Sequence, residues 1–223
     1  MGLSRVRSRG QLGIDAPCVT VETHLGGGLP SFTVVGLPET SVRESRERVR
    51  AALQTAGFNF PVSRITINLA PADLPKQGGR FDLPIALGIL AASAQVPPQS
   101  LHNCEFYGEL SLTGELQHVT GLLPALVAGE RANKTLYIPL ANRHEAALLP
   151  HAKISLVTDL VSLVAQLHGQ PEPAQVLADA GPPIDSDNGD DSLDLNQIIG
   201  QQQAKRALVI AASGNHNLLI LFP

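Results

Sequence analysis

Apolar and polar residues alternate in the first third of the chain with a period of two, which is typical of half-buried strands. Between Pro17 and Leu25, for example, the residues Val-Val-Thr-Leu and Cys-Thr-Glu-His occupy alternate positions. We expect three strands in this region, over residues 3–9, 17–25 and 31–36. Three consecutive glycines and Pro30 follow the second strand, and they predict a turn that joins the second and third strands as a hairpin.

Helical spacing replaces this alternation over residues 39–56, where Val42, Val49 and Leu53 recur on one face. After a further strand, over residues 64–69, the run of residues 83–94 is apolar on all sides and predicts a buried helix. Strands and helices then alternate: strands over 106–110, 135–138 and 154–157, and helices over 122–132, 141–149 and 160–167. Such alternation favours parallel crossover units, whereas the early strands favour antiparallel pairing. The pattern therefore predicts a mixed α/β (α+β) domain over residues 1–169.

The chain changes character after this domain. Residues 172–194 contain seven acidic residues and neither Lys nor Arg, and four prolines lie among residues 170–193. Charge repulsion and the lack of apolar side chains keep such a stretch solvated. We interpret residues 170–193 as an acidic, Pro-rich linker. Residues 194–223 then predict one helix and a short apolar strand.

The formal net charge of −4 hides an uneven distribution. Residues 1–80 contain ten Lys or Arg and six Asp or Glu, a balance of +4. Most of these bases fall in two groups, one on a predicted strand and one on a predicted helix face: Arg5, Arg7 and Arg9, and Arg43, Arg46 and Arg50. Clustered bases can neutralise nucleic-acid phosphates. However, Glu44 and Glu47 lie among the helical bases and no aromatic residue accompanies them, which favours a solvated face with internal pairs.

The composition limits the other classes of site. Cys18 and Cys104 are far apart and lack metal-ligand spacing, so we read them as thiols in a reducing compartment. The seven histidines are scattered, and we expect no metal site. No apolar leader follows Met1, and the longest apolar stretch is too short to span a bilayer. We therefore expect a cytoplasmic protein without a membrane partner.

Two internal segments resemble the proteolytic domain of Lon. The first runs from Leu69 as Leu-Ala-Pro-Ala-Asp-Leu-Pro-Lys-Gln-Gly-Gly-Arg-Phe-Asp-Leu-Pro, and the second from Tyr107 as Tyr-Gly-Glu-Leu-Ser-Leu-Thr-Gly-Glu-Leu. In Lon, the first segment carries a nucleophilic Ser and the second leads to the Lys that activates it. The resemblance places Arg80 at the Ser position and Leu123 at the Lys position. Because Arg stays charged and Leu does not titrate, a Ser–Lys dyad is absent, and we expect no peptidase activity.

The same loop has a second interpretation. It combines two glycines and two cations ahead of the buried helix: Lys76, Gly78, Gly79 and Arg80. A helix N-terminus with free N–H groups and nearby cations can bind an anion, and DNA phosphate is one candidate. The alternative is structural, with Arg80 paired to Asp82 or Asp73 and holding the loop in place.

The last segment extends the resemblance over nearly the whole chain. From Asp194 it reads Asp-Leu-Asn-Gln-Ile-Ile-Gly-Gln-Gln-Gln-Ala-Lys-Arg. With it, the chain resembles the magnesium-chelatase-like AAA+ family called YifB or ComM, whose members place a Lon-type domain before an ATPase module. The resemblance matches Ile199, Gly200 and Gln201 to the backbone beside the adenine. Residues 1–223 contain no Gly-rich loop ending in Gly-Lys-Ser/Thr after the terminal strand, so we expect the phosphate and Mg²⁺ ligands to lie outside them.

This resemblance implies most of the functional expectations. Residues 1–169 would form a Lon-protease-like, ribosomal S5 domain 2-like domain, and residues 194–223 the start of an AAA+ module. The complete protein would use ATP and Mg²⁺, form a hexameric ring of identical subunits, and move DNA branches during recombination and natural transformation. The present chain would hold no cofactor and act as a non-proteolytic accessory domain, with DNA as a candidate partner. A divergent peptidase and a protein-interaction or oligomerisation module are the alternatives.

Overall fold

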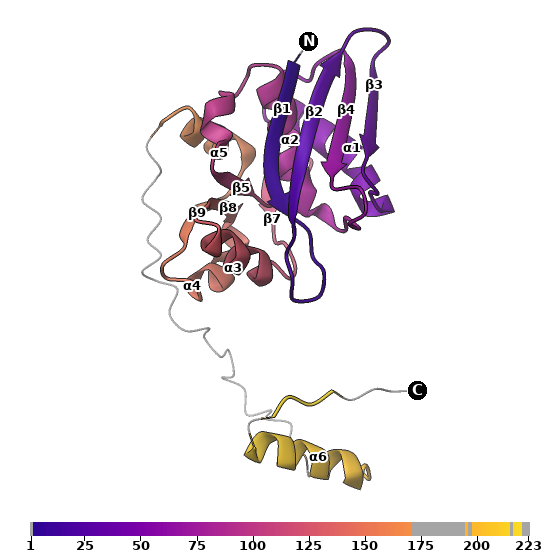
Figure 1. The fold of residues 1–223 in the computed structure, drawn as a ribbon, viewed down its shortest axis with the longest axis vertical. Coiled ribbons are helices and arrows are strands. Elements are labelled where there is room, and N and C mark those ends of the chain that lie inside the picture. The colour runs from indigo at the N-terminus through magenta and orange to yellow at the C-terminus, as the bar shows by residue number, and fades with distance from the viewer. Residues whose placement is uncertain (1, 171–194, 196–197, 215, 220–223) are drawn as a thin grey trace. The chain divides into compact units, whose positions relative to one another are not determined.

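The computed structural model describes residues 2–170, 195, 198–214 and 216–219, and the chain divides into two compact units, residues 1–180 and 181–223 (Figure 1). The predicted linker, residues 170–193, lies outside the described residues except for Gln170. No helix in the described part of the chain is long and apolar enough to cross a membrane.

A four-stranded sheet forms where the sequence alternates. Its strands are β1 (Gly2–Arg9), β2 (Cys18–Gly26), β4 (Arg64–Ala70) and β3 (Ser31–Val35), in the order β1-β2-β4-β3. Successive side chains of a strand point to opposite faces, so Val6 is buried while its neighbours Arg5 and Arg7 are exposed. The sheet therefore has a core face and, at β1, a face that carries cations.

The predicted hairpin between the second and third strands is wrong. β4 lies between β2 and β3, antiparallel to β2 and parallel to β3. The helix α1 (Thr40–Thr55) connects β3 to β4, as a parallel pair requires. The glycine-rich turn at residues 27–30 correctly indicates a reversal of the chain, but turn residues do not determine which strand occupies the adjacent position.

The core face is covered by α2 (Asp82–Ala92), which packs against β1 and β2, while α1 packs against α2 (Figure 1). Residues 82–91 of α2 are all buried, which confirms the predicted buried helix. Gly88 permits a close approach to the sheet, because a Cβ at this position would overlap the hydroxyl of Thr23. Ser4 of β1 also donates a hydrogen bond to the Gly88 carbonyl at 2.7 Å.

The second half of this unit is a parallel sheet with the order β5-β8-β9. Its strands are β5 (Cys104–Phe106), β8 (Thr135–Pro139) and β9 (Lys153–Val157), joined through the helices α3 (Leu123–Arg131) and α4 (Arg143–Ala147), and α5 (Leu160–Leu167) follows. A hairpin of β6 (Glu109–Leu110) and β7 (Leu116–Gln117) and three short 3-10 turns, η1 (Gly79–Phe81), η2 (Pro98–Leu101) and η3 (Leu140–Asn142), complete it. The mixed α/β class is confirmed.

One predicted strand is two separate strands. The expected strand over residues 106–110 is interrupted because Tyr107 donates its N–H to the Tyr137 carbonyl, whereas the N–H of Gly108 turns to the Arg80 carbonyl. The chain thereby passes from the parallel sheet to the β6–β7 hairpin.

The second unit contains α6 (Gln202–Ser213), as predicted. Residues 216–219 form no strand, and residues 220–223 lie outside the described part, so the predicted terminal strand is not formed over its described portion. A strand requires a neighbouring strand for its backbone hydrogen bonds. Val209 and Ile210 of α6 are more than half exposed.

A buried carboxylate joins α1, α2 and β6. Asp82 is fully buried and accepts hydrogen bonds from Arg48 at 2.7 and 3.1 Å, from the Ser45 hydroxyl, and from the Leu110 N–H at 3.3 Å. Burial raises the pKa of Asp82, while the hydrogen bonds from Arg48 and Ser45 oppose this rise. The buried Asp82 carboxylate and the Arg48 guanidinium therefore stabilise the fold only when both are present.

We expect Asp82→Ala to destabilise the first unit by about 3–5 kcal/mol, because breaking a buried pair leaves its partner uncompensated. Urea unfolding followed by circular dichroism measures the loss. Glu47→Ala is the matched control, since it breaks the exposed Arg46–Glu47 pair and should cost only about 0–1 kcal/mol. Equal, small losses in both variants would contradict the structural role of Asp82.

Candidate functional site

The predicted anion loop has its lysine buried. The side chain of Lys76 is inaccessible to solvent, and its Nζ donates a hydrogen bond to the Pro71 carbonyl within the same loop. Burial lowers the pKa of Lys76, and the carboxylate of Asp73 acts in the opposite direction. In this position the ammonium group is engaged by the protein and does not face an external ligand.

Arg80 is also turned inward. Its Nη2 donates hydrogen bonds to Oε1 of Gln11 at 2.8 Å and to the Thr120 carbonyl at 2.9 Å, and the side chain is nearly buried. The expected pairing with Asp82 or Asp73 is wrong, because Arg48 of α1 holds Asp82 and loops distant in sequence reach the Arg80 guanidinium. Burial lowers the pKa of Arg80.

The two loop glycines adopt special conformations. Gly78 has a φ of +72°, which favours glycine. Gly79 is buried against the Glu109 carboxylate, and a Cβ there would overlap that carboxylate. Together with Asp82 in the first turn of α2, Glu109 brings a second carboxylate to the start of this helix. The negative charges of Asp82 and Glu109 would repel an anion bound at the start of α2. The geometry therefore favours the structural interpretation of the loop.

The structure brings the two Lon-like segments together. Arg80 bonds to the carbonyl of Thr120, three residues before Leu123 at the start of α3. The residues at the dyad positions therefore lie on neighbouring segments, as the resemblance implies. Neither side chain supplies a nucleophile or a neutral amine. Among the described residues, no group of three or more His, Cys, Asp or Glu could hold a metal ion.

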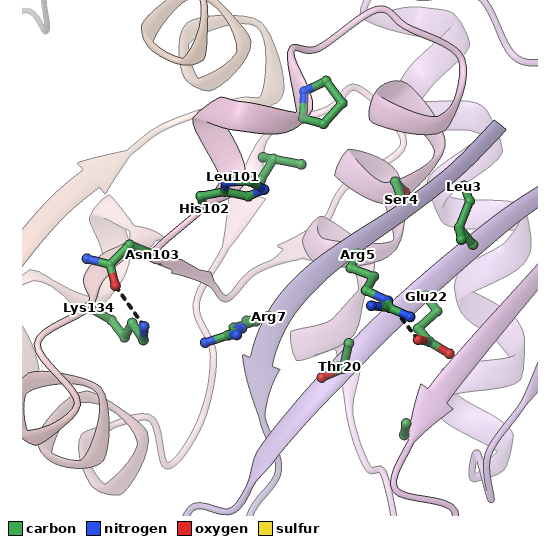
Figure 2. A pocket seen from close by; sticks show the side chains of 12 residues that line it. Leu3, Ser4, Arg5, Arg7, Thr20, Glu22, Leu101, His102, Asn103 and Lys134 are labelled. Atoms are coloured by element: carbon green, nitrogen blue, oxygen red, sulfur yellow. Dashed lines mark hydrogen bonds and ion pairs between the residues drawn. The ribbon is translucent and has the colours of Figure 1, made fainter.

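A surface cavity lies elsewhere, beside β1. It is an open groove of about 860 Å³ between the sheet on one side and, on the other, η2 with the two residues that follow it and Lys134, which precedes β8. Figure 2 shows Arg7 reaching from β1 toward Lys134 and Asn103 on the facing side. We call this cavity the β1 groove, and its polar lining comprises Ser4, Arg5, Arg7, Thr20, Glu22, His102, Asn103 and Lys134.

The β1 groove is cationic. Arg5 pairs with Glu22 at 3.0 Å on the exposed face, and Lys134 donates a hydrogen bond to Asn103 at 2.7 Å. No hydrogen bond or ion pair involves the Arg7 side chain within the described residues. Three cations and one carboxylate thus line the groove. Sequence reasoning identified the strand arginines but missed Lys134, because nothing in the chain places residue 134 beside residue 7.

The third strand arginine has a different role. Arg9 forms two 2.8 Å hydrogen bonds with the buried carboxylate of Glu105, which also accepts a 2.6 Å bond from the Tyr107 hydroxyl. Burial raises the pKa of Tyr107 well above its usual value, so the phenol keeps its proton and donates. Arg9 therefore ties β1 to β5 and does not contribute a free charge to the β1 groove.

In the second unit, the predicted adenine-edge residues precede α6. Ile199 is almost fully exposed, and Gly200 and Gln201 have φ values of +77° and +51°. Gln201 is the N-cap of α6, and Lys205 donates a hydrogen bond to the Ile198 carbonyl. Ile199, Gly200 and Gln201 thus lie in an exposed, irregular segment before α6, and their contact with adenine stays a prediction.

Comparison with known proteins identifies the family. Residues 21–142 match the family described as subunit ChlI of Mg-chelatase, and residues 194–223 match the one described as magnesium chelatase, subunit ChlI. The chain is 49% identical to the competence protein ComM of Haemophilus influenzae, across 100% of this chain and 44% of that protein. It is 43% identical to the protein YifB of Salmonella typhimurium and 36% identical to the protein MT2965 of Mycobacterium tuberculosis, over 100% of this chain and 43% and 44% of those proteins.

The chain therefore spans less than half the length of the curated relatives it matches. The first family match covers more than half of the chain and includes β4, α2 and the loop that contains Lys76 and Arg80. The similarity to ComM and YifB extends over all of it. The chain belongs to the YifB/ComM family of Mg-chelatase-like proteins.

Proposed function

We propose that the chain is the non-proteolytic N-terminal part of a ComM/YifB-type ATPase, and that the complete protein is a ring-forming motor that moves DNA branches in recombination and natural transformation. Family membership and the name of the H. influenzae relative, a competence protein, support this assignment. In this proposal residues 1–169 form a Lon-protease-like domain with a ribosomal S5 domain 2-like fold. Residues 194–223 begin the AAA+ module, and ATP and Mg²⁺ bind elsewhere in the longer protein.

The β1 groove is the observation that supports a DNA contact by this domain. It offers three cations from two separate segments, and Glu22 is the one acid in its lining. Its side chains include no Phe, Tyr or Trp and no array of amides that could read base edges. Such a surface suits sequence-independent contact with phosphates. The predicted DNA contact thereby moves from the buried Lys76–Arg80 loop to Arg5, Arg7 and Lys134.

We expect the chain to bind duplex DNA with a Kd of about 10⁻⁴ to 10⁻⁶ M at physiological salt. Each neutralised phosphate contributes about 0.9 to the slope of log K against log salt, so three cations give a slope of about −2.7. The double variant Arg7→Gln with Lys134→Gln should reduce the slope to about −1, because two contacts are lost. Fluorescence anisotropy of a labelled duplex at several salt concentrations measures both quantities.

The matched control is Arg131→Gln with Arg143→Gln, which removes the same charge from exposed positions on α3 and α4. It should leave the slope within error of the parent chain. An equal fall in both variants would show that net charge, not the β1 groove, controls binding. Unchanged DNA binding with an altered oligomeric state in the groove variant would identify the groove as an assembly surface instead.

The loop cations should affect stability, not DNA binding. Lys76→Ala with Arg80→Ala removes the hydrogen bonds that these two buried side chains donate to the Pro71 carbonyl, the Gln11 side chain and the Thr120 carbonyl, and a hydrogen bond from a charged group contributes about 1.5–3 kcal/mol. Thermal unfolding should show this loss, while the salt slope, measured below the unfolding temperature, should stay unchanged. A slope reduced by about two at unaltered stability would return the DNA contact to this loop.

We also expect no peptidase activity, because Arg80 and Leu123 occupy the dyad positions. Incubation of the purified chain with casein or a fluorogenic peptide should give no turnover above a buffer blank. Turnover that disappears when a single Ser or Thr is replaced by Ala would establish a divergent peptidase and overturn this part of the proposal.

A further inference from the structure

Two phenylalanines and two arginines meet between β3 and α1. The rings of Phe32 and Phe60 are nearly parallel, with an interplanar angle of 13° and centroids 6.4 Å apart. The Arg50 guanidinium lies 5.6 Å from the centre of the Phe60 ring, and Arg46 is one helical turn earlier. The expectation that no aromatic residue accompanies the helical bases is therefore wrong. The rings reach the bases from a strand and a loop that lie on either side of α1 in the sequence.

These four side chains line a cavity of about 130 Å³, which we call the Phe60 pocket. Pockets for drug-sized ligands measure about 300–1,000 Å³, so this one suits a single planar ring. Ser63 also lines it, and its hydroxyl is buried without a hydrogen-bond partner among the described residues. The pocket thus combines flat apolar walls with one unused polar group.

The surroundings of the Phe60 pocket carry positive charge. Arg46 pairs at 3.2 Å with Glu47, and both side chains are about half exposed or more. Arg50 has no ion pair with any described residue. Two bases and one acid therefore lie beside the stacked rings. This charge favours a ligand that carries an anionic group next to a flat ring.

We propose that the Phe60 pocket binds one unstacked base of single-stranded nucleic acid, with Arg46 and Arg50 on the adjoining phosphates. Aromatic side chains beside a basic surface are a general means of binding single strands without sequence preference, since every base presents a π-face. In a duplex the bases are stacked and inaccessible to such a pocket. The inference rests on the proposed role in DNA handling and adds a preference for single-stranded regions.

The test compares two probes that carry the same phosphates. The 223-residue chain is titrated against a labelled 12-nucleotide oligo(dT) and against an abasic strand of the same length. Stacking of one base should make oligo(dT) bind about fivefold tighter or more. Phe60→Leu should bring the oligo(dT)-to-abasic affinity ratio to about one, because the stacking platform is lost. Arg50→Gln should weaken the binding of both strands. Equal affinities of the parent chain for the two strands would overturn the proposal.

A matched control is available in the same loop. Phe58 is also a half-buried phenylalanine packed on the core, but it does not line the pocket, so Phe58→Leu should keep the ratio. A second readout does not rely on removing the aromatic ring at position 60. The chain contains no Trp, so Phe60→Trp supplies a single indole whose emission oligo(dT) should quench and the abasic strand should not. Equal quenching by both strands would contradict base stacking.

The groove variant separates this inference from the proposed function. Arg7→Gln with Lys134→Gln should weaken duplex binding and keep the oligo(dT)-to-abasic ratio. If that variant leaves duplex binding unchanged while Phe60→Leu removes the ratio, the assignment of the β1 groove fails and the Phe60 pocket stands. If the ratio survives Phe60→Leu, the base binds elsewhere and the pocket assignment fails, whatever the groove variant does.

Discussion

The carboxylate of Asp82 is the constraint on which the first unit depends. It begins the buried helix α2, accepts hydrogen bonds from Arg48 and Ser45 of α1, and holds the backbone of β6. A buried charge of this kind is tolerated only when its partners are fixed around it. The position of α1 over the core, and with it the exposure of Arg46 and Arg50, therefore depends on this group.

Arg80 lies two residues before Asp82 and connects the start of α2 to segments other than α1. Its guanidinium bonds to Gln11 in the β1–β2 loop and to the backbone that leads into α3. Arg9 and Glu105 make a second buried link between β1 and β5. These polar contacts join the four-stranded sheet to the parallel sheet. The cations that make them are ones that the sequence pattern alone would assign to ligand binding. The Lon-like loop thus holds the domain together at the place where a peptidase would carry its nucleophile.

The two cationic surfaces, the β1 groove and the Phe60 pocket, lie at the two edges of the four-stranded sheet. β1 forms one edge and contributes to the β1 groove, whereas β3 forms the other and contributes to the Phe60 pocket. The first surface offers cations without Phe, Tyr or Trp, and the second combines cations with two Phe rings. Phosphate contact is available from single and double strands alike, but stacking requires an unpaired base. The two edges therefore differ in the form of nucleic acid that they favour.

The sequence by itself determined the helices, most strands, the α/β class and the family, because periodicity, turn residues and motifs are local properties of the chain. It also places Arg80 and Leu123 at the positions that the resemblance to Lon assigns to the Ser and the Lys. Tertiary structure decided which strand lies beside β3, which partner holds Arg80 and that Lys76 is buried. It also placed Lys134 beside Arg7 and Phe60 beside Arg50. Burial and pairing depend on contacts between segments distant in the chain, and such contacts leave no local pattern from which one sequence could reveal them.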